Sequence, residues 1–121
     1  MKALVVDDSR AMRMFVAKPL RGLGFEIAEA GDGAQALELL RADAAIGLAL
    51  VDWHMPQMDG LSLVQAVRAD PARAGLRILM VTSVAEREQI ARALEAGADD
   101  YIMKPFTAHD LLTRLVMMGI G

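Results

Sequence analysis

The sequence predicts a single α/β domain built on a five-stranded parallel sheet with helices on both faces. Two observations carry this prediction. Short apolar runs alternate strictly with amphipathic helical segments, and each kind occurs five times along the chain. The runs in the middle of the chain are apolar almost throughout, which is typical of parallel strands covered on both faces. The length of 121 residues suits one domain with a core of its own.

Five segments are predicted as strands because they are short, rich in aliphatic and β-branched residues, and bounded by polar or glycine-containing stretches. The second, FEIAEA, alternates apolar and polar residues as a half-buried strand does. The third, IGLALVDW, and the fourth, LRILMVTS, read as central strands. The five predicted strands are 2–6, 25–30, 46–53, 76–83 and 99–105.

Five further segments carry apolar residues at helical spacing. The first contains Pro19, which removes a backbone donor and predicts a kink or a cost of about 3 kcal/mol. The fourth ends at Gly97, a residue typical of the position after a helix. The fifth starts after Thr107, with Asp110 placed to complete a capping box. The predicted helices are 9–24, 34–42, 61–70, 85–97 and 107–119.

Composition excludes several classes of function. The net charge of −3 provides no basic surface for direct nucleic-acid binding. The absence of cysteine excludes disulfides and thiolate metal sites. No apolar run approaches the roughly 18 residues that a membrane span needs, and charge follows the N-terminus too closely for a secretory signal. We therefore expect a cytoplasmic protein that contacts neither membrane nor nucleic acid directly.

Polar side chains follow the predicted strands at one and the same end. Asp7 and Asp8 follow the first strand, Asp52 ends the third, and Thr82 and Lys104 mark the ends of the fourth and fifth. Taken alone, each has an ordinary explanation, such as helix capping by Asp8 or a solvated Lys104. Because the carboxyl ends of parallel strands meet at one edge, where α/β proteins bind ligands, the combination predicts a site.

The chemistry of that site follows from its charges. Three clustered carboxylates repel one another, and a hard divalent cation with oxygen ligands, Mg²⁺, relieves this repulsion. One lysine alone leaves the acids in excess, whereas Mg²⁺ and Lys104 together balance them. A metal ion, an ammonium and a hydroxyl are the groups that stabilise a transferring phosphoryl group. A carboxylate facing such a group can act as nucleophile and become an acyl phosphate.

Four motifs occur in order, each at the end of a predicted strand: VVDDS (5–9), VDWHMPQMDG (51–60), VTS (81–83) and YIMKPF (101–106). In these motifs, and over its whole length, the chain resembles the CheY-like receiver domains of response regulators. The resemblance implies a flavodoxin-like fold with strand order 2-1-3-4-5 and one receiver domain spanning residues 1–121. It also implies a phosphoprotein of a cytoplasmic two-component, or His-Asp phosphorelay, system.

The resemblance also implies an acceptor and a metal site. Asp52 matches the residue that is phosphorylated. Asp7, Asp8, Asp52 and the backbone carbonyl of His54 match the groups that bind Mg²⁺, with Asp8 a direct ligand and Asp7 acting largely through water. The side chain of His54 is then not required as a ligand.

Further roles follow from the same resemblance. Thr82 and Lys104 match the hydroxyl and the ammonium that complete the catalytic set around the acceptor. Thr82 and Tyr101 match the pair of side chains that switch position on phosphorylation. The family also favours a cis peptide bond before Pro105, and a bond to proline is the one kind for which cis is inexpensive.

The implied partners are a sensor histidine kinase or phosphotransfer protein as phosphoryl donor, and a downstream protein target. The target would bind the surface formed by the fourth helix, the fifth strand and the fifth helix. Such a protein is a regulator with intrinsic autophosphorylation and autodephosphorylation chemistry, and not an enzyme.

Two other functions remain open from the residues alone. The first is a phosphohydrolase or phosphotransferase with an aspartyl-phosphate intermediate. Such enzymes usually carry a second acid two residues after the nucleophile, where this chain has His54, and they need a substrate pocket for which 121 residues leave little room. The second is a receiver-like domain used only for binding. It would be expected to lack the acceptor or an acid, and none is missing here.

Overall fold

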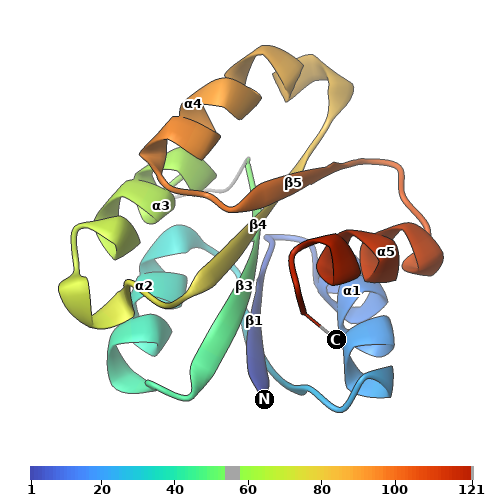
Figure 1. Cartoon of the computed structure of the whole chain (residues 1–121), viewed down its shortest axis with the longest axis horizontal. Coiled ribbons are helices and arrows are strands. Elements are labelled where there is room, and N and C mark those ends of the chain that lie inside the picture. Colours follow the sequence, from blue (N-terminus) through green and yellow to red (C-terminus); the bar gives the residue numbers. More distant parts are fainter. Residues whose placement is uncertain (54–57, 121) are drawn as a thin grey trace.

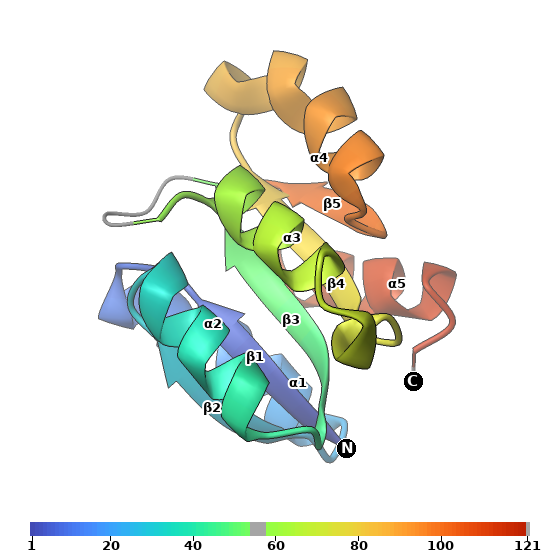
Figure 2. The same ribbon diagram turned by 90° about the vertical axis from the view of Figure 1, so that its left-hand side faces the viewer.

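The computed structural model describes residues 1–53 and 58–120, with Val84 described by its backbone alone. Five strands form one sheet in the order β2-β1-β3-β4-β5, and every neighbouring pair is parallel, as Figures 1 and 2 show. This arrangement confirms the predicted fold class and strand order. The strands are β1 (Lys2–Val6), β2 (Glu26–Ala30), β3 (Ile46–Asp52), β4 (Arg77–Thr82) and β5 (Asp100–Met103).

Helices cover both faces of the sheet (Figure 1). Helices α1 and α5 pack on one face, where Val16, Leu20, Leu111 and Leu115 join the buried core. Helices α2, α3 and α4 pack on the other face. The helices are α1 (Arg10–Gly22), α2 (Gly33–Ala42), α3 (Gly60–Arg68), α4 (Ile90–Ala96) and α5 (Ala108–Met117), with short 3-10 helices η1 (Pro71–Arg73) and η2 (Val84–Gln89).

The central strand β3 has a continuous apolar sequence because its side chains enter the core on both faces of the sheet. Successive side chains of a strand point to opposite faces. Leu48 and Leu50 therefore enter the core under α1 and α5, whereas Ala49 and Val51 enter the core under α2, α3 and α4. Because both faces are covered, a polar side chain on β3 loses its contact with water. Asp52, the last residue of the strand, is the one side chain of β3 that is polar.

Most helices begin at a side chain that caps them. The side-chain oxygens of Ser9, Asp32, Asp59 and Thr107 accept hydrogen bonds from backbone N–H groups in the first turns of α1, α2, α3 and α5. The capping box predicted at the start of α5 is present, since the Asp110 carboxylate accepts a bond from the Thr107 N–H at 2.9 Å. Helix α1 continues through Pro19 to Gly22.

The predicted helix 85–97 differs from the structure in its first half. Residues Val84–Gln89 form a 3-10 helix, and regular α-helix begins only at Ile90. The first turn closes with an i→i−3 bond from the Glu86 N–H to the Ser83 carbonyl at 3.0 Å, and the Glu86 side chain accepts bonds from the Ser83 N–H and hydroxyl. At the other end the prediction holds, because Gly97 follows the helix with a φ of +120°.

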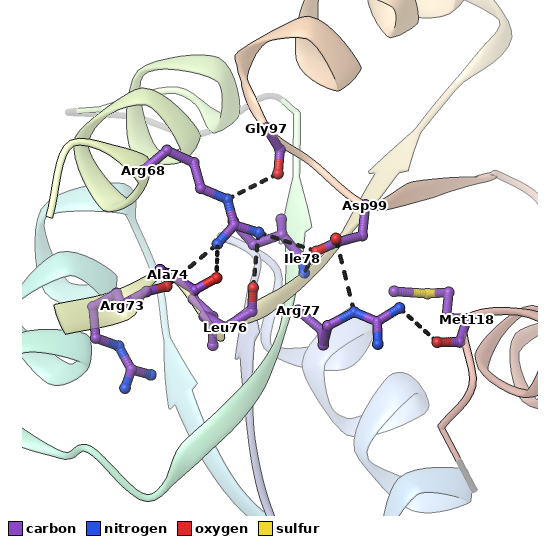
Figure 3. A network of polar contacts seen from close by, with 9 residues as sticks. All are labelled: Arg68, Arg73, Ala74, Leu76, Arg77, Ile78, Gly97, Asp99 and Met118. Atoms are coloured by element: carbon purple, nitrogen blue, oxygen red, sulfur yellow. Dashed lines mark hydrogen bonds and ion pairs between the residues drawn. The ribbon is translucent and has the colours of Figure 1, made fainter. Parts of the chain in front are cut away.

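Arg68, the last residue of α3, ties several elements together at the amino edge of the sheet (Figure 3). Its guanidinium donates hydrogen bonds to the carbonyl oxygens of Leu76 at 2.7 Å, Gly97 at 2.9 Å and Arg73 at 3.3 Å. It also pairs with the Asp99 carboxylate at 3.0 Å. These contacts join the end of α3, the segment before β4 and the connection between α4 and β5.

Within the residues that the structure describes, no helix has the length and apolar character needed to cross a membrane.

Candidate phosphoryl-transfer site

The polar residues singled out at the strand ends come together at the carboxyl edge of the sheet. Asp7 directly follows β1, Asp52 is the last residue of β3, and Lys104 directly follows β5. Thr82 ends β4, and its carbonyl oxygen accepts a bond from the Lys104 N–H at 2.7 Å. Asp52 is in register with Val81, one residue before Thr82. The parallel register thus gathers side chains that lie up to 97 residues apart in the sequence, from Asp7 to Lys104.

Three carboxylates form the centre of the site. One oxygen from each of Asp7, Asp8 and Asp52 lies within 4.8 Å of the others, close enough for one ion to contact all three. Asp52 is only 6% exposed and Asp7 is equally buried, whereas Asp8 is open to solvent. Hard, charged oxygens with one open side suit Mg²⁺, which keeps several waters in its shell. The donor set therefore fits the predicted metal.

Lys104 supplies the one ammonium described close to these acids. Its Nζ lies 3.3 Å from Asp52 Oδ1 and 3.8 Å from Asp7 Oδ2. One positive charge against three negative charges leaves the site electronegative. An incoming cation is therefore attracted to the site.

Burial changes the acidity of the carboxyl groups. Loss of solvent around Asp52 raises its pKa to about 6, the nearby Asp7 charge adds to this rise, and Lys104 opposes it. Burial likewise raises the pKa of Asp7, against a lowering by the Ser9 N–H that bonds to its Oδ1 at 2.9 Å. At neutral pH Asp52 is still mostly ionised, and its carboxylate is more basic than an ordinary one.

The backbone around Asp52 is held by close contacts. The Trp53 N–H donates to the Val81 carbonyl at 3.0 Å, and the Gly60 N–H donates to the Trp53 carbonyl at 3.0 Å. A Cβ at Gly60 would lie 2.7 Å from the Asp52 carbonyl oxygen, so the chain returns to β3 at a distance that only glycine allows. His54, whose carbonyl was predicted as a metal ligand, lies outside the described residues.

The predicted switch pair lies on two neighbouring strands. Thr82 pairs with Met103, and Tyr101 pairs with Met80, so the two side chains are diagonal neighbours on the same face of the sheet. Thr82 is buried, and Tyr101 is partly buried against the core under α2, α3 and α4. The Arg114 guanidinium lies over the Tyr101 ring, 5.4 Å from its centroid.

Sequence reasoning missed one charged residue near this site. Glu86, in η2, is only 4% exposed, and its charge is among those that raise the pKa of Asp52. The signal was present in the sequence as SVAE at 83–86, a serine followed three residues later by a glutamate, which is a capping-box pattern. The pattern predicts the bonds between Ser83 and Glu86 but not the burial of the Glu86 side chain.

The peptide bond between Lys104 and Pro105 is cis, as expected.

Comparison with known proteins agrees with this geometry. A family model described as the response regulator receiver domain matches residues 3–116. The chain is 45% identical over 116 residues to the chemotaxis protein CheY of Pseudomonas aeruginosa, covering 95% of this chain and 93% of that protein. It is 43% identical over 121 residues to the chemotaxis protein CheY1 of Helicobacter pylori strain J99, covering 98% of both.

Solved structures give the same result. The chemotaxis response regulator CheY4 of Vibrio cholerae superposes with a TM-score of 0.89 at 32% identity, over 97% of both chains. A putative response regulator from Chloroflexus aurantiacus superposes with the same TM-score and identity, over 97% of this chain and 95% of that one.

Proposed function

The chain belongs to the response regulator receiver domain family, and from this premise we propose that it is a switch controlled by phosphorylation of Asp52. It is a receiver domain of the CheY-like kind that acts in two-component signalling, where such proteins are signalling proteins rather than conventional enzymes. In this proposal the receiver domain spans residues 1–121. The observation that carries the proposal is the buried Asp52 carboxylate, 3.3 Å from the Lys104 ammonium and within 4.8 Å of two further acids.

Each residue has a distinct role in the transfer. An oxygen of Asp52 bonds to phosphorus while the bond from phosphorus to the donor nitrogen of a phosphohistidine breaks, and the released imidazole takes its proton from solvent. The Lys104 ammonium stabilises the negative charge of the transferring group. Asp7, Asp8, Asp52 and the His54 carbonyl would hold Mg²⁺, which when bound neutralises the acids and the phosphoryl oxygens.

The proposed output is a change on one surface of the protein. Phosphorylation gives the acceptor side chain roughly −1.5 to −2 of charge in place of a carboxylate. The Thr82 hydroxyl moves to bond a phosphoryl oxygen, and Tyr101, its diagonal neighbour, turns into the space that Thr82 leaves. This changes the surface of α4, β5 and α5, where a downstream protein binds. A sensor histidine kinase or a phosphotransfer protein supplies the phosphoryl group.

The test of the acceptor is direct. Purified protein incubated with acetyl phosphate and Mg²⁺ should gain the mass of one phosphoryl group, and Asp52→Asn should not. Asp32→Asn is a matched control because asparagine also caps helices, so α2 is preserved and labelling should continue. Labelling of Asp52→Asn at the wild-type level would contradict the proposal. Repeated turnover of a phosphomonoester such as p-nitrophenyl phosphate would instead indicate a phosphohydrolase.

The test of the output surface uses a phosphoryl mimic. Amide chemical shifts are compared with and without beryllofluoride at saturating Mg²⁺. The proposal expects changes through residues 84–110, remote from the acids as well as next to them. Changes confined to the neighbours of Asp52 would contradict a signalling surface on α4, β5 and α5.

A further inference from the structure

We propose that Arg13 is a positioning residue of the metal site: it fixes the peptide between Asp7 and Asp8 so that both carboxylates face one cation. This inference rests on the proposed function and adds a residue of α1 to the same site. The role of Arg13 needs no contact with the phosphoryl group or the metal ion. Arg13 acts through the backbone of the acid pair, and Glu29 on β2 holds its side chain in place.

The side chain of Arg13 turns back from α1 toward the end of β1. Side chains of a helix tilt toward its amino end, and Arg13 lies four residues after the capping Ser9, to whose carbonyl its N–H donates at 3.0 Å. The guanidinium therefore reaches the segment that enters the helix, where Nη1 donates to the Asp7 carbonyl at 2.7 Å. Among the described residues, Arg13 supplies the one side-chain hydrogen bond to the backbone of the acid pair.

The Asp7 carbonyl belongs to the peptide that joins the two acids. The Asp7 N–H is bonded to the Ala30 carbonyl at 3.1 Å, and Ser9 begins α1, so the backbone is held on both sides of Asp8. Because a peptide group is planar, the bond from Arg13 to the Asp7 carbonyl also sets the direction of the Asp8 N–H and Cα. Asp8 is exposed, so little packing holds its carboxylate. The direction of that carboxylate toward the cation therefore depends on this peptide.

Glu29 holds the guanidinium at this angle. It lies on β2 in register with Val5, and the Arg13 Nε donates to its Oε1 at 2.9 Å. The Arg13 side chain is only 18% exposed, so the pair is partly shielded from water. The Glu29 carboxylate also offsets the charge of Arg13, which would otherwise repel an incoming cation. A planar guanidinium directs one N–H to each partner at fixed angles, which a lysine ammonium on a flexible chain does not.

Magnesium titration separates positioning from charge. Arg13→Ala removes a positive charge next to the acid pair and leaves Glu29 unpaired, so charge alone would make Mg²⁺ bind more tightly. The positioning role predicts the opposite, a loss of about tenfold in affinity. Arg13→Lys keeps the charge without the planar donor and should lose about threefold. Wild-type or tighter affinity in either variant would overturn the inference.

Two control variants separate positioning from stability. Arg21→Ala removes an exposed arginine from the last turn of α1 and should bind Mg²⁺ within about twofold of the wild type. Arg68→Ala weakens the opposite edge of the sheet and should keep wild-type affinity at a temperature where it is folded. Trp53 fluorescence follows each titration. A loss in Arg68→Ala equal to that in Arg13→Ala would show that instability alone weakens binding, and would overturn the inference.

The carbonyl carbon of Asp7 tests the bond in metal-free protein. Its resonance should move upfield in Arg13→Ala, because the carbonyl loses a charged donor, and should stay in place in Arg21→Ala. An unmoved resonance in Arg13→Ala would overturn the role of the bond. These outcomes are separable from failure of the proposed function, which would appear as wild-type protein that neither binds Mg²⁺ nor accepts a phosphoryl group.

Discussion

At the scale of single residues, the properties of Asp52 come from its surroundings. A carboxylate at the end of a strand buried on both faces loses solvent, and its neighbours Asp7 and Asp8 carry the same charge. The one described ammonium nearby, Lys104, offsets only part of this. The same features that raise the pKa of Asp52 therefore destabilise the folded protein when no metal ion is bound.

This cost predicts a stabilising substitution. Burial raises the pKa of Asp52 from 3.8 to about 6, so above pH 6 the group is ionised in both states and the folded state carries the cost. We expect Asp52→Asn to raise the free energy of unfolding by about 1–2 kcal/mol in EDTA at pH 7, allowing for partial solvent screening. The gain should shrink as the pH falls through 6 towards 4, where the wild-type carboxyl group is protonated in the folded state and about half protonated in the unfolded state.

Urea unfolding at pH 7 and near pH 4 measures both values. Addition of Mg²⁺ at pH 7 should stabilise the wild type more than Asp52→Asn, because the variant has lost one of the grouped carboxylates. A variant less stable than the wild type in EDTA at pH 7, or a gain independent of pH, would refute this account of the acidic cluster.

The acid pair should contribute unequally to Mg²⁺ binding. Asp8 is exposed and can give an oxygen directly, whereas Asp7 is buried, bonds to the Ser9 N–H and lies 3.8 Å from Lys104. We expect Asp8→Ala to lose about tenfold or more in affinity, and Asp7→Ala to lose less. Asp43→Asn, at the opposite edge of the sheet, serves as control. Titrations followed by the fluorescence of Trp53, the only tryptophan, measure these affinities, and unchanged affinity in Asp8→Ala would refute the ligand assignment.

At the scale of elements, the amino edge of the sheet depends on Arg68. Its planar guanidinium reaches four carbonyl oxygens and the Asp99 carboxylate from one position (Figure 3). Arg68→Ala should lower the free energy of unfolding by about 2–4 kcal/mol, because partly buried carbonyls lose a charged donor. Arg68→Lys should recover little, since an ammonium cannot reproduce the fork.

Denaturation by urea gives these differences, with Arg92→Ala, an exposed arginine on α4, expected within about 0.5 kcal/mol of the wild type. Labelling by acetyl phosphate should survive in folded Arg68→Ala, because the acids lie at the other edge of the sheet. An Arg68→Ala protein as stable as the Arg92→Ala protein would show that the network contributes little.

The return of the chain to β3 depends on Gly60. A Cβ there would lie 2.7 Å from the Asp52 carbonyl oxygen and 3.1 Å from the Trp53 Cα, and backbone atoms cannot give way as a side chain can. Gly60→Ala should cost about 1–3 kcal/mol and displace the acceptor, reducing labelling as well. Gly47→Ala, in β3 with nothing within 4 Å of the added carbon, is the matched control. Equal stability of the two variants would contradict the proposed close approach.

At the scale of the whole molecule, the fold could be predicted because the hydrophobic pattern, the order of the segments and the rules of chain connection all indicate the same parallel sheet. Apolar runs such as IGLALVDW and amphipathic segments alternate, and right-handed crossovers leave few arrangements. The acids and Lys104 could be placed together because parallel strands align their carboxyl ends. The burial of Glu86 and the 3-10 start of the predicted helix 85–97 could not, because burial depends on how η2 packs once the sheet exists. The local pattern predicts the bonds that Ser83 donates to the Glu86 carboxylate, but not the direction in which the connection folds.

The central claim is that Asp52 itself carries the phosphoryl group, and chemical trapping tests it most directly. Borohydride reduces an acyl phosphate of aspartate to homoserine, so the acceptor becomes a stable marker in the chain. After reaction with acetyl phosphate and Mg²⁺, reduction and digestion, peptide mass spectrometry should find homoserine at position 52 and at no other aspartate. Homoserine at Asp7, Asp8 or another acid, with position 52 unmodified, would contradict the account.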